Sequence, residues 1–313
     1  MNLSVVVCTH NPNLEILTKV LESIRAQTLP VAQWELLVID NSSTPPLDKN
    51  IDISWHSNAR IVIEQKLGLS FARLAGVAKA QTELIVFVDD DNILEENYLE
   101  KAATFHVQHP QVGCFGGKSI AIFETPPPEW FFKAGINLGC QEYGDQVYVS
   151  DYRKDNYQLK DYPIKAPIGT GMVIQKKAFM LYLEEVKHST KRLALGRKGK
   201  ALTSGEDNDI VLTIVKRGFE IAYVPDLIVK HLIPQKRYSL DYLKQMAFES
   251  SRSWIKVLDL HGISKWEKIS PKSLPLRYLK SWMRYKPWKS PLNRIRDQGS
   301  CGTYKGVSEL DKH

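Results

Sequence analysis

Three consecutive carboxylates, Asp89, Asp90 and Asp91, directly follow the run 83–88, which is apolar after Glu83. A run of this composition predicts a buried strand of a parallel sheet, and open α/β sheets bind ligands at the carboxyl ends of their strands. Because side chains alternate along an extended chain, Asp89 and Asp91 are expected on one side and Asp90 on the other. Such a pair suits Mg²⁺ or Mn²⁺, which commonly bridges to phosphates. The alternative is a solvated acidic turn that caps the next helix.

The segments around this motif predict alternating strands and helices. Strands are expected at 3–8, 34–39 and 60–64, and helices at 14–26 and from 68 to 80. This alternation predicts βαβ units and a parallel sheet with right-handed crossovers. Polar residues follow the first two strands, namely Thr9, His10 and Asn11, and then Asp40. All are expected to meet the three aspartates at one edge of the sheet.

The order and spacing of these motifs resemble family 2 glycosyltransferases, which have the GT-A fold. The resemblance covers about residues 3–245 and rests on segments 5–11, 40–43, 68–73, 87–91, 169–172, 205–209 and 231–237. One departure is Leu74, where the family often has Asn. The resemblance implies an α/β, Rossmann-like and mostly parallel sheet with flanking helices.

The same resemblance implies a domain plan. A GT-A domain is expected over 1–235, with a nucleotide-binding half at about 1–118 and an acceptor half at about 119–235. Apart from the resemblance, the apolar spacing between Leu240 and Leu258 and the composition of the tail predict a helical extension rich in basic and aromatic residues over 236–313.

The resemblance also implies where a nucleotide diphosphate sugar binds. The expected donor-binding residues are Thr9, His10, Asn11, Asp40, Arg73, Asp89, Asp90 and Gly171. A carboxylate at Asp40 can accept a hydrogen bond from a base N–H or a ribose hydroxyl. His10 is alternatively a packed or capping histidine, Arg73 a partner in a surface ion pair, and Gly171 part of a plain turn.

A divalent cation, Mn²⁺ or Mg²⁺, is the cofactor that the resemblance implies. Asp91 is the main expected ligand, followed by Asp89, and both would help to neutralise the leaving diphosphate. His231 follows an expected strand and would complete the metal shell as a neutral imidazole. The alternative for His231 is a structural role before the next helix.

A general base is expected in the Gly-Glu-Asp segment at 205–207. Asp207 is favoured and Glu206 is the second choice, since family members differ in which acid takes the proton. A carboxylate in either place can accept the proton of an acceptor hydroxyl. Helix capping alone also explains acids in a first turn. The resemblance implies an inverting transfer without a covalent intermediate.

Two basic segments suggest further contacts. Residues 271–296 hold eight Lys or Arg and no acid, with Trp282, Tyr285 and Trp288 interleaved. This pattern suits an anionic membrane surface; a solvated face is the alternative, and no nucleic-acid-binding motif is present. The segment 187–200, with six Lys or Arg, predicts a mobile loop beside the site or a charged surface loop.

Composition limits the remaining possibilities. The 313 residues are 43% hydrophobic, and four scattered cysteines fit a reducing compartment. No signal peptide and no apolar run of membrane-spanning length is recognised. We therefore expect a cytoplasmic protein, peripheral on the inner face of the plasma membrane if the basic tail binds lipid.

Three functions fit these observations. The first is an inverting, metal-dependent transferase that glycosylates a glycan or lipid-linked acceptor in cell-surface or extracellular polysaccharide synthesis. The second is a nucleotidyltransferase, although the segment 8–12 lacks its glycine-rich and basic loop. The third is a non-catalytic binding module for a nucleotide sugar, which has no need of a base.

Overall fold

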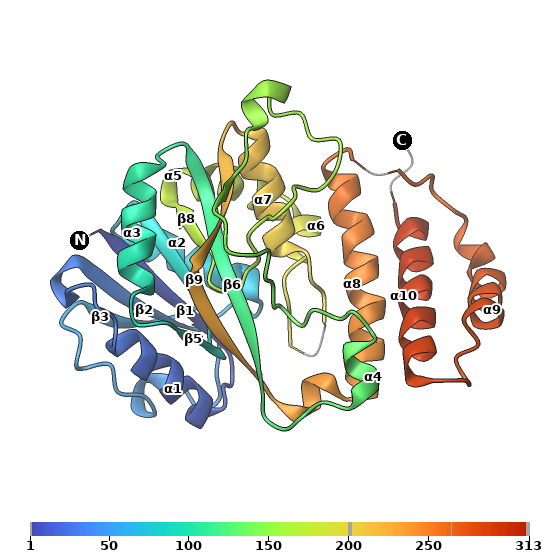
Figure 1. The fold of residues 1–313 in the computed structure, drawn as a ribbon, viewed down its shortest axis with the longest axis horizontal. Coiled ribbons are helices and arrows are strands. Elements are labelled where there is room, and N and C mark those ends of the chain that lie inside the picture. Colours follow the sequence, from blue (N-terminus) through green and yellow to red (C-terminus); the bar gives the residue numbers. More distant parts are fainter. Residues whose placement is uncertain (1, 200–201, 264, 311–313) are drawn as a thin grey trace.

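The structure is a computed structural model that describes residues 2–199, 202–263 and 265–310. Over these residues one nine-stranded sheet has the order β3-β2-β1-β4-β8-β6-β9-β5, and β7 pairs with β9 (Figure 1). The strands are β1 (Leu3–Thr9), β2 (Trp34–Asp40), β3 (Ala59–Ile63), β4 (Leu84–Asp89), β5 (Asn92–Leu94), β6 (Val112–Phe123), β7 (Tyr148–Val149), β8 (Val173–Gln175) and β9 (Glu220–Ile233).

At one end of the sheet, the neighbouring strands β3, β2, β1 and β4 all run parallel to one another. Val6 pairs with Leu37 of β2 on one side and with Phe87 of β4 on the other. β8 runs antiparallel between β4 and β6, and β9 is parallel to β6. The predicted α/β architecture is therefore confirmed. Three strands extend one residue further than predicted, so that Thr9, Asp40 and Asp89 are the last residues of β1, β2 and β4.

Helices cover both faces of the sheet (Figure 1). They are α1 (Leu14–Arg25), α2 (Leu69–Lys79), α3 (Tyr98–Gln108), α4 (Glu129–Phe132), α5 (Lys176–Val186), α6 (Thr190–Leu193), α7 (Glu206–Lys216), α8 (Leu240–Leu260), α9 (Leu274–Tyr285) and α10 (Pro291–Ser308). Side chains of Asn13, Ser239 and Ser290 accept hydrogen bonds from first-turn amides of α1, α8 and α10, which fixes where these helices begin. None of the described helices combines the length and the apolarity needed to cross a bilayer.

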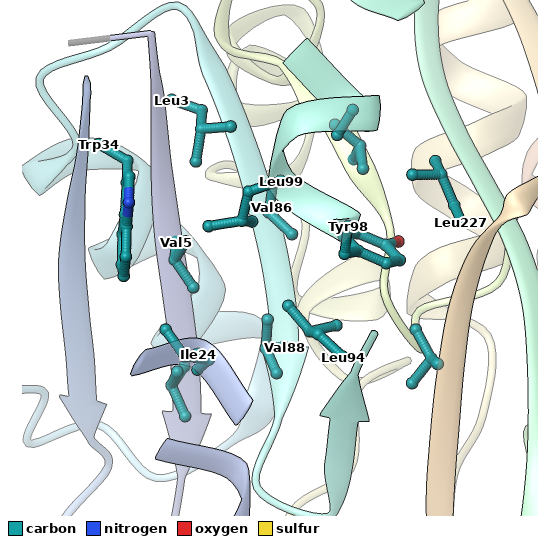
Figure 2. Packing of buried hydrophobic residues seen from close by; sticks show 14 of the residues in the cluster. Leu3, Val5, Ile24, Trp34, Val86, Val88, Leu94, Tyr98, Leu99 and Leu227 are labelled. Atoms are coloured by element: carbon teal, nitrogen blue, oxygen red, sulfur yellow. The ribbon is translucent and has the colours of Figure 1, made fainter. Parts of the chain in front are cut away.

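Alternate residues of β1 enter two different cores. Val5 and Val7 pack with Ile24 and Trp34 in the cluster shown in Figure 2. Val6 and Cys8 point to the opposite face, where they pack among residues of α2, α5 and α7. Because successive side chains of a strand face opposite ways, a strand that is apolar throughout must be covered on both faces. The two cores, one on each face of the sheet, hold the end of β1 in a fixed position relative to the helices that cover it.

The predicted helical extension is present as α8, α9 and α10. Helix α8, however, also contributes to the main pocket of the molecule. Met246 and Ser250 of α8 line the main pocket at the sheet edge. Nε2 of His261, just after α8, lies 2.7 Å from Oδ1 of the buried Asp209 of α7, which Arg192 of α6 also contacts at 3.3 Å. In addition, β6 crosses the predicted boundary at 118/119, and β8 lies between β4 and β6. The division at 235 and the two halves remain predictions.

Gly117 provides a test of the β6–β9 junction. The pairing shifts register between Gly116 and Lys118, and a Cβ on Gly117 would meet the carbonyl oxygen of Leu227 at 2.0 Å. We expect Gly117→Ala to lower the free energy of unfolding by about 1–3 kcal/mol, measured by urea denaturation. Gly299→Ala in α10 is the matched control, since its Cβ would meet Ser251 Oγ at 3.4 Å and the Ala247 carbonyl oxygen at 3.8 Å, which are ordinary contacts. Equal stability of the two variants would contradict this account of the junction.

Candidate active site

A pocket of about 530 Å³ opens at the carboxyl edge of β1 and β4. Its walls come from the loops after these strands, from α2, from the start of α7, from the end of β9 and from α8. Nine of the residues predicted from the sequence line this pocket: Thr9, His10, Arg73, Asp89, Asp90, Asp91, Glu206, Asp207 and His231. Segments that are far apart in sequence therefore place five carboxylates around one cavity.

Arg73 of α2 lies at the base of this pocket. Its side chain is 4% exposed and makes two ion pairs, to Asp89 at 3.4 Å and to Glu206 at 3.8 Å. The guanidinium also lies 5.4 Å from the centroid of the Phe87 ring. Burial lowers the pKa of Arg73, but Glu206 and Asp89 outweigh this effect and hold the pKa above its ordinary value. Arg73 thus carries a buried positive charge that links α2, β4 and α7, and the surface ion pair considered from the sequence is excluded.

The three aspartates have different surroundings. Asp90 accepts a hydrogen bond from the Thr9 hydroxyl at 2.5 Å. Burial, followed by repulsion from Asp91, raises the pKa of Asp90 to about 7. Burial also raises the pKa of Asp89, against the lowering effect of Arg73. At neutral pH Asp90 therefore holds a proton part of the time, which reduces the repulsion within the triplet.

Asp91 is bound by two cationic side chains. Its Oδ2 lies 2.8 Å from Nη1 of Arg237 and 3.2 Å from Nε2 of His231. Burial alone would raise the pKa of Asp91, but His231 and Arg237 lower it. Burial would lower the pKa of His231, but Asp91 raises it to about 9. Asp91 is therefore ionised, and its charge favours the protonated form of His231.

The donor set at this edge fits a hard divalent cation in part. Asp89 and Asp91 offer carboxylate oxygens, and His231, once it has lost a proton, would offer an imidazole nitrogen beside Asp91; Mn²⁺ and Mg²⁺ accept such ligands. Arg237 already places a positive charge 2.8 Å from Asp91 Oδ2, where a cation would bond. The described residues form no cluster of three metal-ligating side chains. They would therefore hold a metal by one or two carboxylates, with substrate phosphates and water completing the shell.

Glu206 and Asp207 begin α7 with different environments. Glu206 is 3% exposed and forms an ion pair with Arg73 at 3.8 Å. Burial raises the pKa of Glu206 to about 7, although Arg73 lowers it. Asp207 is half-buried; one oxygen accepts from the Gly169 N–H at 3.0 Å. The helix dipole stabilises both as anions, but Asp207 is the more accessible to an incoming hydroxyl.

Three predicted donor-binding residues do not line the pocket. Both oxygens of Asp40 accept backbone N–H groups, from Ser43 at 2.9 Å and Leu47 at 3.0 Å. Asn11 has φ 47 and accepts from the Thr44 N–H at 2.8 Å. Gly171, at φ 70, accepts a hydrogen bond from the Tyr98 hydroxyl. The three residues shape the loops around the site, and their contact with a donor stays a prediction.

Arg237 and Asn41 also line the pocket. No role was predicted for Arg237 from the sequence. Arg237 lies in the segment 231–237, one of those on which the family resemblance rests. Its ion pair with Asp91 becomes visible only in the folded structure. Asn41 follows β2 and donates to the carbonyls of Glu64 and Lys66 at 3.0 and 2.8 Å. Asn41 lies at the pocket edge, as its position directly after a strand predicts.

The basic segment 187–200 divides into two parts. Arg192 is buried and pairs with Glu185 at 2.6 Å and with Asp209, so it is a structural residue. Arg197 lines the pocket. Lys200 lies outside the described residues.

With this geometry in place, comparison with known proteins assigns the family. Residues 4–183 match the profile described as "Glycosyl transferase family 2". The chain belongs to this family.

Curated relatives are distant in sequence. The "N-acetylglucosaminyltransferase" of Bradyrhizobium diazoefficiens is 22% identical over 280 residues, covering 87% of this chain and 54% of that protein. The corresponding protein of Azorhizobium caulinodans is 24% identical over 239 residues, covering 74% and 54%. The chain thus spans about half the length of these relatives.

A solved structure shows the same fold. The "Crystal structure of S. aureus TarS 1-349 in complex with UDP-GlcNAc" matches 99% of this chain and 91% of that chain, with a TM-score of 0.50 and 16% identity. The expected GT-A fold is confirmed.

The buried carboxyl of Glu206 predicts a pH dependence of stability. Its pKa is about 7 in the folded protein, against an ordinary value of 4.5. Between these values the folded state binds more protons than the unfolded chain, so the free energy of unfolding falls as pH rises. We expect the stability of the wild type relative to Glu206→Gln to decrease by about 1–3 kcal/mol from pH ~5 to pH ~8, measured by urea denaturation. Glu129→Gln, at an exposed position, controls for the substitution. A difference that does not change with pH would contradict the raised pKa.

Proposed function

We propose that this protein transfers a sugar, with inversion, from a nucleotide diphosphate sugar to a hydroxyl of a glycan or lipid-linked acceptor in cell-surface or extracellular polysaccharide synthesis. The observation that carries this proposal is the convergence of Asp89, Asp91, Arg73 and Asp207 on one pocket at the carboxyl edge of the sheet. A transferase of this class needs charge compensation for a departing diphosphate and a base for the acceptor, and the pocket holds groups suited to both.

The proposed reaction is a single displacement. The acceptor hydroxyl oxygen bonds to the anomeric carbon of the donor sugar while the bond from that carbon to the diphosphate oxygen breaks. The bonding pair leaves with the diphosphate, and Asp207 takes the hydroxyl proton. The Gly169 N–H holds one Asp207 oxygen at 3.0 Å and so orients the carboxylate. Glu206 keeps Arg73 in place at 3.8 Å and is the alternative base.

Positive side chains are available to offset the charge of the diphosphate. Arg73, Arg197 and Arg237 line the pocket, and Arg237 is already engaged with Asp91. A bound Mn²⁺ or Mg²⁺, held by Asp91 and Asp89 with His231 beside them, would supply further electrostatic stabilisation of the leaving group. Binding of a donor would then compete with Asp91 for Arg237.

The names of the relatives support a particular sugar. Three curated relatives are called N-acetylglucosaminyltransferases, at 22–24% identity. Staphylococcus aureus "Poly(ribitol-phosphate) beta-N-acetylglucosaminyltransferase TarS" is 28% identical over 115 residues, which cover 35% of this chain and 19% of that protein. We therefore propose UDP-N-acetylglucosamine as the first donor to test.

Asp207→Asn tests the assignment of the base. We expect the turnover number for transfer to fall by roughly 10²–10⁴-fold, with little change in donor affinity, because the amide oxygen still accepts the Gly169 N–H but cannot take a proton. Transfer kinetics and calorimetric binding of the donor separate the two effects. Asp155→Asn, an exposed aspartate outside the pocket lining, is the control. If Glu206→Gln abolished turnover while Asp207→Asn retained it, Glu206 would be the base.

Removal of the metal tests the role of Asp91. The protein would be incubated with a panel of nucleotide sugars in Mn²⁺, Mg²⁺ or EDTA, and released nucleoside diphosphate would be assayed. We expect release from one donor only when metal is present, and loss of the metal effect on donor binding in Asp91→Asn. If EDTA left donor binding unchanged, the metal proposal would be overturned. If the protein bound none of the nucleotide sugars, the proposed function would be overturned.

A further inference from the structure

Helix α9 forms the outermost layer of the C-terminal helices. Figure 1 shows α10 lying between α8 and α9. α10 is fixed to α8 partly by Glu309, just after its last turn, which accepts from Arg252 Nε and Nη2 at 2.7 and 2.8 Å. α9 contacts α10 on one side only, so its other side faces away from the protein.

The side of α9 that contacts α10 is mixed, with polar contacts beside the half-buried Leu274, Tyr278 and Tyr285. Ser281 is 1% exposed and donates a hydrogen bond to Asp297 of α10 at 2.6 Å. Arg277, four residues earlier and therefore on the same face, lies over the Tyr304 ring of α10 at 5.6 Å. A helix on the surface of a globular protein normally turns its apolar stripe toward the core. In α9, by contrast, a large part of the apolar surface is left exposed.

The outward side of α9 is apolar. Leu276, Leu279 and Met283, at positions i, i+3 and i+7, are 59%, 50% and 51% exposed. Trp282 is next to them, and Trp288 folds back against it with ring centroids 4.4 Å apart while both stay about half exposed. Exposed apolar clusters of this kind mark interaction surfaces. We call these five residues the α9 apolar face.

Positive charge surrounds the α9 apolar face. Lys280 and Arg284 are exposed on α9, and Lys286 and Lys289 are exposed beside Trp288. No acid occurs in 271–296. A second copy of this surface would be repelled by its own charge, whereas an anionic bilayer complements both the apolar face and the cations.

We propose that the α9 apolar face docks on the surface of an anionic lipid bilayer, such as the inner leaflet of a plasma membrane. The Leu, Met and Trp side chains enter the interfacial region, and the flanking Lys and Arg contact lipid phosphates. The helix lies in the plane of the interface and does not span the bilayer.

Docking in this way would hold the pocket near membrane-borne acceptors. α8 lines the pocket with Met246 and Ser250, and two interhelical distances of 8–10 Å separate α8 from α9, roughly 20 Å in all. This consequence rests on the proposed function, but the docking itself does not.

Vesicle co-sedimentation of the full chain tests the proposal. Vesicles of phosphatidylcholine alone would be compared with vesicles containing phosphatidylglycerol, at low salt and at about 0.5 M NaCl. We expect sedimentation only with the anionic vesicles, weakened at high salt. Both Leu279→Gln/Met283→Gln and Lys280→Gln/Arg284→Gln should lower the partition coefficient at least about tenfold. Val107→Gln on α3, at a side chain 78% exposed, is the matched control and should bind as the wild type does.

Thermal melts that match the wild type would show that the variants are folded, since all substituted positions are exposed. The proposal would be overturned if both double variants sedimented with the vesicles as well as the wild type does. It would also be overturned if the wild type did not sediment with anionic vesicles. So would a wild-type dimer that Leu279→Gln/Met283→Gln makes monomeric, because a second copy would then cover the face. Binding to RNA or DNA without binding to vesicles would likewise overturn it. Nucleotide-sugar binding, measured in parallel, is expected to be equal in all variants, so failure of docking and failure of the proposed function are distinguishable.

Discussion

The buried charge of Arg73 is the constraint on which the site depends. A guanidinium stays protonated in proteins, and burying it is costly unless carboxylates surround it. Asp89 at the end of β4 and Glu206 at the start of α7 provide these partners at 3.4 and 3.8 Å. The same interaction holds two acid-bearing elements at one edge of the sheet. Without Arg73, the negative charges around the pocket would repel one another in a poorly solvated space.

A second network supports the same arrangement from the C-terminal side. Asp209, on the first turns of α7, is fully buried and contacts both Arg192 of α6 and His261 at the end of α8. Because Asp207 lies only two residues before Asp209, this network also helps to fix the proposed base. The C-terminal helices are therefore part of what shapes the pocket, and they carry the outward apolar face of α9 on a rigid support.

The sequence predicted the parts of the site that local pattern determines. Strand ends at a common edge place Asp89, Asp90 and Asp91 near Thr9, and the acids that begin α7 follow from its periodicity. The pair of Arg237 with Asp91 was not predicted, because residues 146 positions apart meet only through the packing of β9 and η4 (Gln235–Tyr238). Nor was the burial of Asp40 by backbone N–H groups predicted, since it depends on the path of the loop. The composition of 271–296 indicated a basic and aromatic surface but gave no sign of which side of α9 faces α10.

A crystal structure of the protein with UDP and Mn²⁺ would test the central claim most directly. Anomalous scattering locates the manganese independently of the protein coordinates. The account predicts the metal beside Asp91 and the diphosphate, with UDP in the pocket lined by Arg73 and Asp207, and with Arg237 moved from Asp91 toward the phosphates. UDP bound elsewhere on the molecule, or a pocket that stays empty while Arg237 and Asp91 remain paired, would contradict it.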